Sequence, residues 1–148
     1  MLTTAIMFFC LNITPASAAN LGLQHEIRAA SEFESTQEAA KAGNVDAMAK
    51  LGSMYYLGQD IPEDDPRAIW WMSKAAKLNQ PYAQACLGLF YLEGKIIPQS
   101  NLQAYIWLFK AAMNGDMDVI KPLAFVRSQM SADQISEGNR ILISGLIL

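Results

Sequence analysis

Residues 49–76 read AKLGSMYYLGQDIPEDDPRAIWWMSKAA, and residues 85–112 read ACLGLFYLEGKIIPQSNLQAYIWLFKAA. A shift of 36 residues aligns the two stretches, and over residues 47–76 thirteen of thirty positions are identical. Unrelated segments of ordinary composition would share about two. A period of this length is typical of stacked helix pairs, because one pair cannot bury its apolar face alone. The sequence therefore predicts an all-α fold, an α-solenoid of antiparallel helix pairs.

Cap residues divide each repeat into two helices. Gly58 and Gly94 are expected to end the first helix, because glycine adopts the left-handed conformation without strain. Asp64 and Ser100 are the expected N-caps of the second helix, and Ser100 with Gln103 fits a capping box. The expected ends of successive second helices are again spaced by 36 residues: Gly43, Asn79 and Gly115.

Most of the aromatic residues follow the period of the repeat. Tyr55 and Trp71 recur as Tyr91 and Trp107, in register with the apolar stripe of each helix. A ligand-binding cage has no reason to repeat at the period of the fold, so these four side chains are predicted to be structural. In contrast, Tyr56 and Trp70 have no aromatic counterpart 36 residues later and need another explanation.

Partial repeats flank the two full ones. Residues 26–43 have the pattern of a second helix without its partner. The segment after Gly115 has the pattern of a first helix. Pro122 lies inside it and should kink the helix or delay its start. Ser131 and Gln134 form another predicted capping box, which opens the last helix. The total is about seven helices.

The repeat pattern resembles that of the Sel-1-like repeat family. Both copies contain A-x-x-x-L-G-x-x-Y-x-x-G, then I-P, a cap residue and A-x-x-W-x-x-x-A-A. The resemblance covers about 38–135, and it implies a right-handed superhelical stack related to tetratricopeptide repeats. We therefore expect a repeat domain over residues 26–148, with full repeats at about 44–79 and 80–115. The resemblance also implies a protein-interaction scaffold, frequently in exported bacterial proteins, and it does not identify the partner.

The N-terminus has the pattern of a secretory signal peptide. Residues 5–13 are apolar, Pro15 interrupts the run, and small residues at 16–18 fit cleavage after Ala18, although no Lys or Arg precedes the run. We expect residues 1–18 to be removed and the protein to be exported, periplasmic or secreted. The alternative is an ordinary apolar N-terminal helix. A stable membrane span in the mature chain is not expected, since a span needs about 20 apolar residues.

Cleavage would leave one cysteine, Cys86, so no intramolecular disulfide is expected. Cys86 lies in an apolar helical pattern and is predicted to be a small buried core residue.

The charge pattern argues against nucleic acid as a partner. The net charge is −3, and the eleven Lys and Arg residues are scattered rather than clustered. An acidic loop could bind a cation or a basic partner, but its counterpart in the second repeat is uncharged. Caps and solvated charge at a helix start are therefore the preferred interpretation. The acidic loop contains Asp60, Glu63, Asp64 and Asp65.

Motifs for catalysis are missing from the sequence. It contains no G-x-S-x-G, H-E-x-x-H, C-x-x-C or S-x-x-K motif and no phosphate-binding glycine loop, and it has one histidine. We therefore expect no catalytic residues, no metal and no cofactor, and a protein that is not an enzyme. Two alternatives stay open: a cell-wall-associated hydrolase, β-lactamase-like or peptidoglycan-acting, and a fragment of a larger repeat scaffold.

The first helices of such a stack form its concave face, which is the expected binding groove for a peptide or protein. The predicted groove is apolar with acidic edges and suits an extended or helical peptide with basic flanks. By alignment with tetratricopeptide repeats, the groove positions are Asp46, Ala49, Ser53, Tyr56, Leu57, Tyr82, Ala85, Leu89, Leu92 and Glu93.

The C-terminal run Ile141–Leu148 is apolar on more than one face. Ile135, Leu142 and Leu146 form one stripe of the last helix, and Ile141 and Ile143 lie off it. The run is too short to cross a bilayer. We expect it either to pack back on the preceding helices or to make a homotypic contact.

Overall fold

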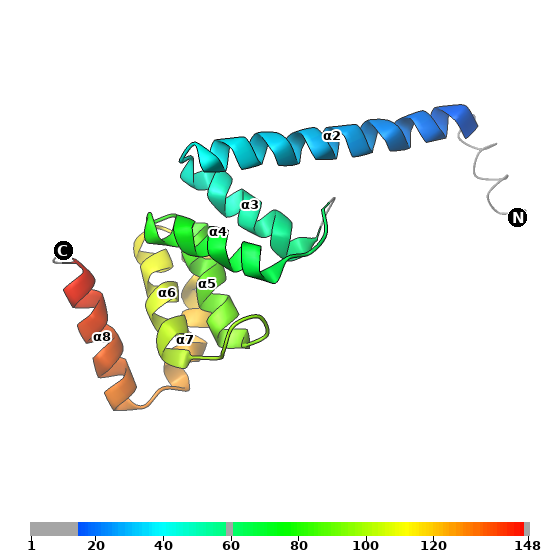
Figure 1. The fold of residues 1–148 in the computed structure, drawn as a ribbon. Coiled ribbons are helices and arrows are strands. Elements are labelled where there is room, and N and C mark those ends of the chain that lie inside the picture. Colours follow the sequence, from blue (N-terminus) through cyan, green and yellow to red (C-terminus); the bar gives the residue numbers. More distant parts are fainter. Residues whose placement is uncertain (1–14, 59–60, 147–148) are drawn as a thin grey trace, which may run out of the picture. The chain divides into compact units, whose positions relative to one another are not determined.

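The computed structural model describes residues 15–58 and 61–146 of the chain (Figure 1). This part contains seven α-helices, one short 3₁₀-helix and no strands, which confirms the predicted fold class. The chain divides into two units, residues 1–35 and 36–148, and each is described by itself. The elements are α2 (Pro15–Lys41), α3 (Val45–Leu57), α4 (Asp65–Lys77), α5 (Pro81–Glu93), α6 (Asn101–Met113), the 3₁₀-helix η1 (Met117–Val119), α7 (Ile120–Ser128) and α8 (Ala132–Leu146).

The described part of the first unit is the helix α2 as far as Ser35. Its side chains from Gln24 to Ser35 are exposed or half-buried, and Ile27 is 61% exposed. Most of the expected leader, residues 1–14, lies outside the described residues. Among the helices that are described, none combines the length and the apolar character that a bilayer span requires.

In the second unit the helices end where the cap residues predict. Gly58 and Gly94 follow α3 and α5 with φ of 61° and 69°. Oδ1 of Asp64 accepts a hydrogen bond from the Arg67 amide at the start of α4 (2.8 Å). Ser100 caps α6 through its hydroxyl, but the capping box is only half formed. The Ser100 amide donates to the Tyr91 carbonyl (2.9 Å), as the Asp64 amide does to that of Tyr55 (2.9 Å).

Glycine lets the two helices of each repeat approach closely. A Cβ placed on Gly52 would lie 2.8 Å from Cγ of Met72, and one on Gly88 would lie 2.6 Å from Cγ of Leu108. Such distances are shorter than carbon–carbon contact, so a larger residue here would separate α3 from α4 or α5 from α6.

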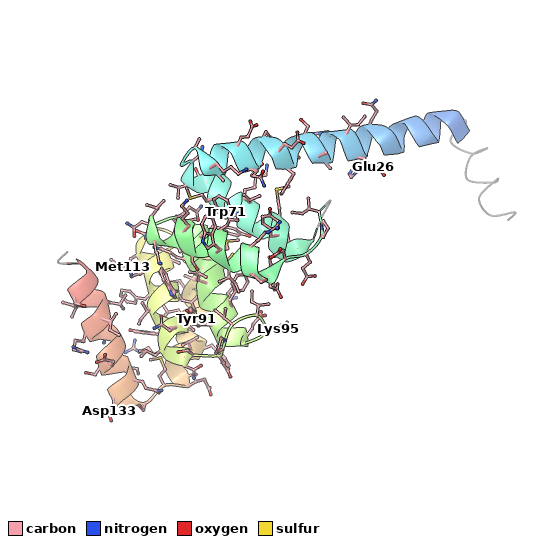
Figure 2. All side chains as sticks on the ribbon, in the orientation of Figure 1. Glu26, Trp71, Tyr91, Lys95, Met113 and Asp133 are labelled. Atoms are coloured by element: carbon pink, nitrogen blue, oxygen red, sulfur yellow. The ribbon has the colours of Figure 1, made fainter. Side chains whose placement is uncertain are left out.

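The core follows the repeated apolar positions. Leu51, Met72, Leu108 and Val126 are fully buried. Tyr55 and Trp71 are buried as predicted, and Trp71 is 9% exposed. Trp71 is labelled in Figure 2. Their counterparts Tyr91 and Trp107 are only half-buried, so the second repeat encloses its aromatic residues less completely.

One buried amide departs from the repeat and links its two copies. Gln84 is 0% exposed and takes the position of Met48 in the first repeat. Its Nε2 donates to the Ala76 carbonyl at the end of α4 (3.0 Å), and its Oε1 accepts from Nδ2 of Asn114 at the end of α6 (2.7 Å). Because donor and acceptor are both used, the burial of this amide carries little penalty.

Helix α8 packs alongside α6 rather than pairing with α7 (Figure 1). The contact is close at Gly138, where a Cβ would lie 2.8 Å from the Tyr105 ring. The Tyr105 hydroxyl donates to Oδ1 of Asn139 (2.8 Å), and Leu142 is 6% exposed. Contact between α7 and α8 is sparse by comparison. The array of helix pairs therefore ends at α7, and α8 covers the outer side of the last complete pair.

The predicted start of α8 is confirmed, and one prediction about its faces is wrong. Ser131 and Gln134 exchange both hydrogen bonds of a capping box (3.2 and 2.9 Å). Ile141 does not lie off the packed stripe, because it is half-buried against the α6 core next to Leu142. Ile143 is 59% exposed. The helix thus packs back on α6 as far as Leu142, and residues 147–148 lie outside the described part.

Pro122 delays the helix in which it lies, as predicted. The chain forms the 3₁₀-turn η1 first, and α7 begins at Ile120, two residues before the proline. The missing amide of Pro122 therefore falls in the first turn, where it would have no partner within the helix.

Candidate functional site

A cavity of about 260 Å³ opens between α3 and α5 in the second unit. Helix α3 contributes three of the lining residues, α5 contributes five, and one comes from α4. The lining residues are Ser53, Tyr56, Leu57, Met72, Tyr82, Cys86, Leu89, Phe90 and Glu93.

Six of the ten predicted groove residues line this cavity, namely Ser53, Tyr56, Leu57, Tyr82, Leu89 and Glu93. The other four do not. Ala49 and Ala85 are buried, with 2% and 6% exposure. Asp46 is exposed and accepts a long hydrogen bond from Nε2 of Gln80 (3.4 Å). Leu92 is half-buried against the α6 core.

Aromatic and aliphatic side chains form the walls. The rings of Tyr56 and Phe90 lie 4.9 Å apart at an interplanar angle of 49°. Leu57 and Tyr82 are 55% and 49% exposed. Tyr56, which the repeat leaves unexplained, therefore belongs to this cavity rather than to the repeated core.

Three polar side chains, Ser53, Tyr82 and Cys86, lie together in the apolar wall of the cavity. Oγ of Ser53 and the hydroxyl of Tyr82 form a hydrogen bond of 3.0 Å between α3 and α5. This hydrogen bond lowers the pKa of Tyr82, but burial and the neighbouring Cys86 thiol raise it more, so the net pKa lies above its ordinary value. The group connects the two helices across the cavity.

Cys86 is not the buried core residue that its pattern predicts, because it is half-buried and faces the cavity. Burial raises the pKa of its thiol above the ordinary value, and the charge of Asp116 acts in the same direction. A hydrogen bond with Tyr82 lowers the pKa but is outweighed. At neutral pH the thiol is therefore protonated, and nucleophilic chemistry requires the thiolate.

Cys86, Met72 and Phe90 were not predicted as lining residues. A signal for Cys86 was present in the sequence, because Tyr82, Cys86 and Leu89 stand at i, i+4 and i+7 on one helix face. Met72 gave no such signal, since it comes from the second helix and reaches the cavity past Gly52.

Trp70 lies outside the cavity, on the outer face of α4. It is 55% exposed, and its ring meets Trp71 edge-on with centroids 4.5 Å apart. Nζ of Lys74 lies 4.9 Å from the Trp70 centroid. The contact of Lys74 with Trp71 (5.4 Å) recurs in the second repeat between Lys110 and Trp107 (5.1 Å), whereas its contact with Trp70 does not, because position 106 is isoleucine.

The acidic loop serves the start of α4. Asp64 caps the helix and forms an ion pair with Arg67 (3.2 Å), and Asp65 lies in the first turn. Asp60 lies outside the described residues. Within residues 15–58 and 61–146, no three acidic, histidine or cysteine side chains gather as metal ligands would.

The geometry defines an α-solenoid of repeated helix pairs with a cavity between successive first helices. Comparison with known proteins gives the family. The family model of the Sel1 repeat matches residues 45–80 and 81–116. The chain therefore contains two Sel1 repeats, as its sequence pattern predicts. Repeats of this family are typically non-catalytic and bind protein partners.

Two solved structures share the fold. One is c5321, a protective antigen present in uropathogenic Escherichia coli strains that displays an SLR fold. Its identity is 25% and its TM-score 0.71, over 74% of this chain. The chain spans only 24% of that protein. The other is a Sel1 repeat protein from Oxalobacter formigenes, with 21% identity and a TM-score of 0.59 over 74% of this chain and 98% of that one. Among curated proteins, none matches the chain.

Proposed function

We propose that the protein is an exported, non-catalytic interaction module that binds a partner protein or peptide in the cavity between α3 and α5. The supporting observation is the composition of this cavity. Tyr56 and Tyr82 have no aromatic counterparts in the other repeat, and both line it. Side chains that the repeat does not need are therefore concentrated at one concave place.

The size of the cavity favours one large apolar side chain as the anchor of the partner. Sites for drug-sized ligands usually enclose about 300–1,000 Å³, and this cavity is about 260 Å³. An aromatic or long aliphatic anchor would contact Tyr56 and Leu89, while the Ser53 and Tyr82 hydroxyls offer hydrogen bonds to its backbone.

Glu93 at the edge favours a basic residue next to this anchor. Its carboxylate is paired with Nζ of Lys95 at 3.4 Å, and both side chains are largely exposed. Exposed ion pairs contribute little stability, typically about 0–1 kcal/mol. An incoming Lys or Arg can therefore replace Lys95, in agreement with the expected basic flanks.

The raised pKa of Cys86 supports binding rather than covalent catalysis at this site. Although the thiol lines the cavity, the charge that acts on it among the described residues is that of Asp116, which disfavours the thiolate, whereas a cationic neighbour or base would favour it.

Peptide selection tests the binding proposal. Short random peptides are selected on the protein, and each recovered peptide is titrated against wild type, Tyr56→Ala and Trp70→Ala. We expect Tyr56→Ala to weaken binding at least tenfold, which corresponds to about 1.4 kcal/mol, and Trp70→Ala to leave it unchanged. In a Cys10→Ser background, bound peptide should also slow alkylation of Cys86. Equal losses in the two variants, or no protection of Cys86, would contradict the proposal.

Export is tested separately. N-terminal sequencing of material recovered outside the cytoplasm should begin at Ala19 or Asn20. Recovery of chains that begin at Met1 would remove the export part of the proposal and leave the binding part standing.

A further inference from the structure

Helix α7 has the pattern of the first helix of a pair, but within the described part of the second unit no following helix covers it as α4 covers α3 and α6 covers α5. Positions 48, 84 and 120 are equivalent in the 36-residue period. Met48 and Gln84 are 2% and 0% exposed, whereas Ile120 is 46% exposed. Gly52 and Gly88 are buried against α4 and α6, and their counterpart Ala124 is exposed. The face of α7 that would contact a second helix is therefore open.

This open face is basic where the inner repeats are apolar. Lys121 takes the position of Ala49 and Ala85, and Arg127 takes that of Tyr55 and Tyr91. Both cations are exposed, and α7 itself contains no acidic residue. A helix that pairs with α7 should therefore bring carboxylates to this face.

Helix α2 has the complementary feature, because it has the pattern of a second helix and no first helix of the chain precedes it among the described residues. In α4 the side chains of Ala68 and Trp71 are 0% and 9% exposed where they face the core. Their counterparts in α2, Glu32 and Ser35, are exposed.

The charge of α2 is opposite to that of α7. From residue 24 to residue 41, α2 contains four glutamates, at positions 26, 32, 34 and 38, against Arg28 and Lys41. One of the four, Glu32, stands where the inner repeats place an alanine against the first helix. Helix α2 therefore places a carboxylate, and helix α7 places Lys121 and Arg127, at positions that belong to the helix–helix interface in a full repeat.

We propose that the protein assembles head to tail, with α2 of one copy packing on the open face of α7 of a second copy. Each such contact completes one more helix pair, built from two chains. The two partners use different surfaces, so the contact is heterologous, and it continues from copy to copy unless the rotation closes a ring. This inference goes beyond the proposed peptide-binding function and does not depend on it, because neither face contributes to the α3–α5 cavity.

Complementary charge reversals test the assembly. Lys121→Glu/Arg127→Glu blocks the α7 face, and Glu32→Lys/Ser35→Lys blocks the α2 face. We expect the mass of the wild type in sedimentation experiments to rise with protein concentration beyond twice the 16.3 kDa of one chain. Each variant alone should stay monomeric. An equimolar mixture should assemble with the two variants alternating, because the two unmodified faces pair with each other and the two reversed faces do the same. A chain with all four substitutions should assemble again.

Lys74→Glu/Lys77→Glu is the matched control, since it makes the same change of charge on the exposed face of α4 and should leave assembly unchanged. Circular dichroism checks that every variant keeps its helix content. High salt should weaken the wild-type assembly, because it screens exposed charges. A wild type that stays monomeric at every concentration would overturn the proposal. An assembly that both charge reversals leave intact would also overturn the proposal, because it would use another surface, such as Ile141–Leu148.

Discussion

Trp70 and Ile106 occupy the same position in the two full repeats, yet Trp70 is 55% exposed and Ile106 is 5% exposed. The reason lies outside the repeat. Helix α8 packs on the face of α6 that contains Ile106 and Tyr105, and no other described helix of the second unit covers the matching face of α4 in this way. Burial at an equivalent position is therefore decided by what the chain places next to a repeat, as well as by the repeat itself.

The side chains of the two faces agree with this difference. On α6 the face contains Tyr105 and Phe109, and at the matching positions α4 has Ile69 and Ser73. The larger aromatic pair of α6 is packed under α8, with its rings 6.0 Å apart. The two repeats thus have the same backbone plan and different outer faces.

The largest expected effect is at the repeated tryptophans. Trp71→Ala should lower the free energy of unfolding by about 3–5 kcal/mol, as truncations of buried aromatics do. Trp107→Ala should cost clearly less, roughly 2–3 kcal/mol, because its side chain is half-buried. Urea denaturation of the two variants measures both values. Equal losses would show that the second repeat encloses its tryptophan as completely as the first.

The next effect compares the outer faces directly. Ile106→Ala should cost about 2–4 kcal/mol, since it leaves a cavity under α8. Trp70→Ala removes a larger side chain but should change stability by roughly 0.5 kcal/mol, as exposed substitutions usually do. Thermal unfolding of the two variants measures both losses of stability. A larger loss at Trp70 would mean that α4 has a cover of its own.

A smaller effect concerns the hydrogen bond that α8 makes to α6. Tyr105→Phe removes the donor to Asn139 and should cost about 1 kcal/mol, the usual net value of one hydrogen bond. Asn139→Ala is the matched change on the other helix, and the double variant closes a thermodynamic cycle. Additive losses would show that the two side chains do not interact in solution.

The smallest expected effect is a difference in the pH dependence of thiol alkylation between Cys86 and its counterpart in the first repeat, position 50. In a Cys10→Ser background, the alkylation rate of Cys86 should rise at higher pH than that of an exposed thiol, because its pKa is raised. A Lys50→Cys chain that also contains Cys86→Ser provides that exposed thiol. Since folding favours the protonated thiol, the contribution of Cys86 to stability is full below the unfolded pKa. It is lost as pH rises through the folded pKa. Identical pH profiles for the two cysteines would contradict the burial of Cys86.

Local features of the fold could be predicted from the sequence because each rests on one or two residues. Gly58 and Gly94 have the left-handed conformation that their positions require, and Ser131 with Gln134 forms its capping box. Six of the nine lining residues of the cavity were also predicted, through the alignment of the repeat with tetratricopeptide repeats.

The position of α8 could not be predicted in the same way, because it depends on a competition between two surfaces. One is the apolar outer face of α6, and the other is the open face of α7, where Lys121 and Arg127 replace residues that are apolar in the full repeats. Comparing equivalent positions across all three first helices would have indicated the outcome. No signal in the sequence indicated that Met72 lines the cavity, because its side chain reaches the cavity only through the close approach of α4 at Gly52.

The buried amide of Gln84 has a consequence for how the repeats unfold. Stacked repeats behave approximately as a one-dimensional chain of units, in which cooperativity comes from the interfaces between neighbours. Gln84 belongs to the second repeat, accepts from Asn114 of that repeat and donates to Ala76 of the first. If the first repeat unravels, Nε2 of Gln84 loses its acceptor, and if the second repeat unravels, the Ala76 carbonyl loses its donor. A buried group that is left without its partner costs about 1–3 kcal/mol. Opening one repeat alone therefore carries a penalty that opening both together avoids. A single polar side chain thus makes the two repeats gain and lose their structure as one unit.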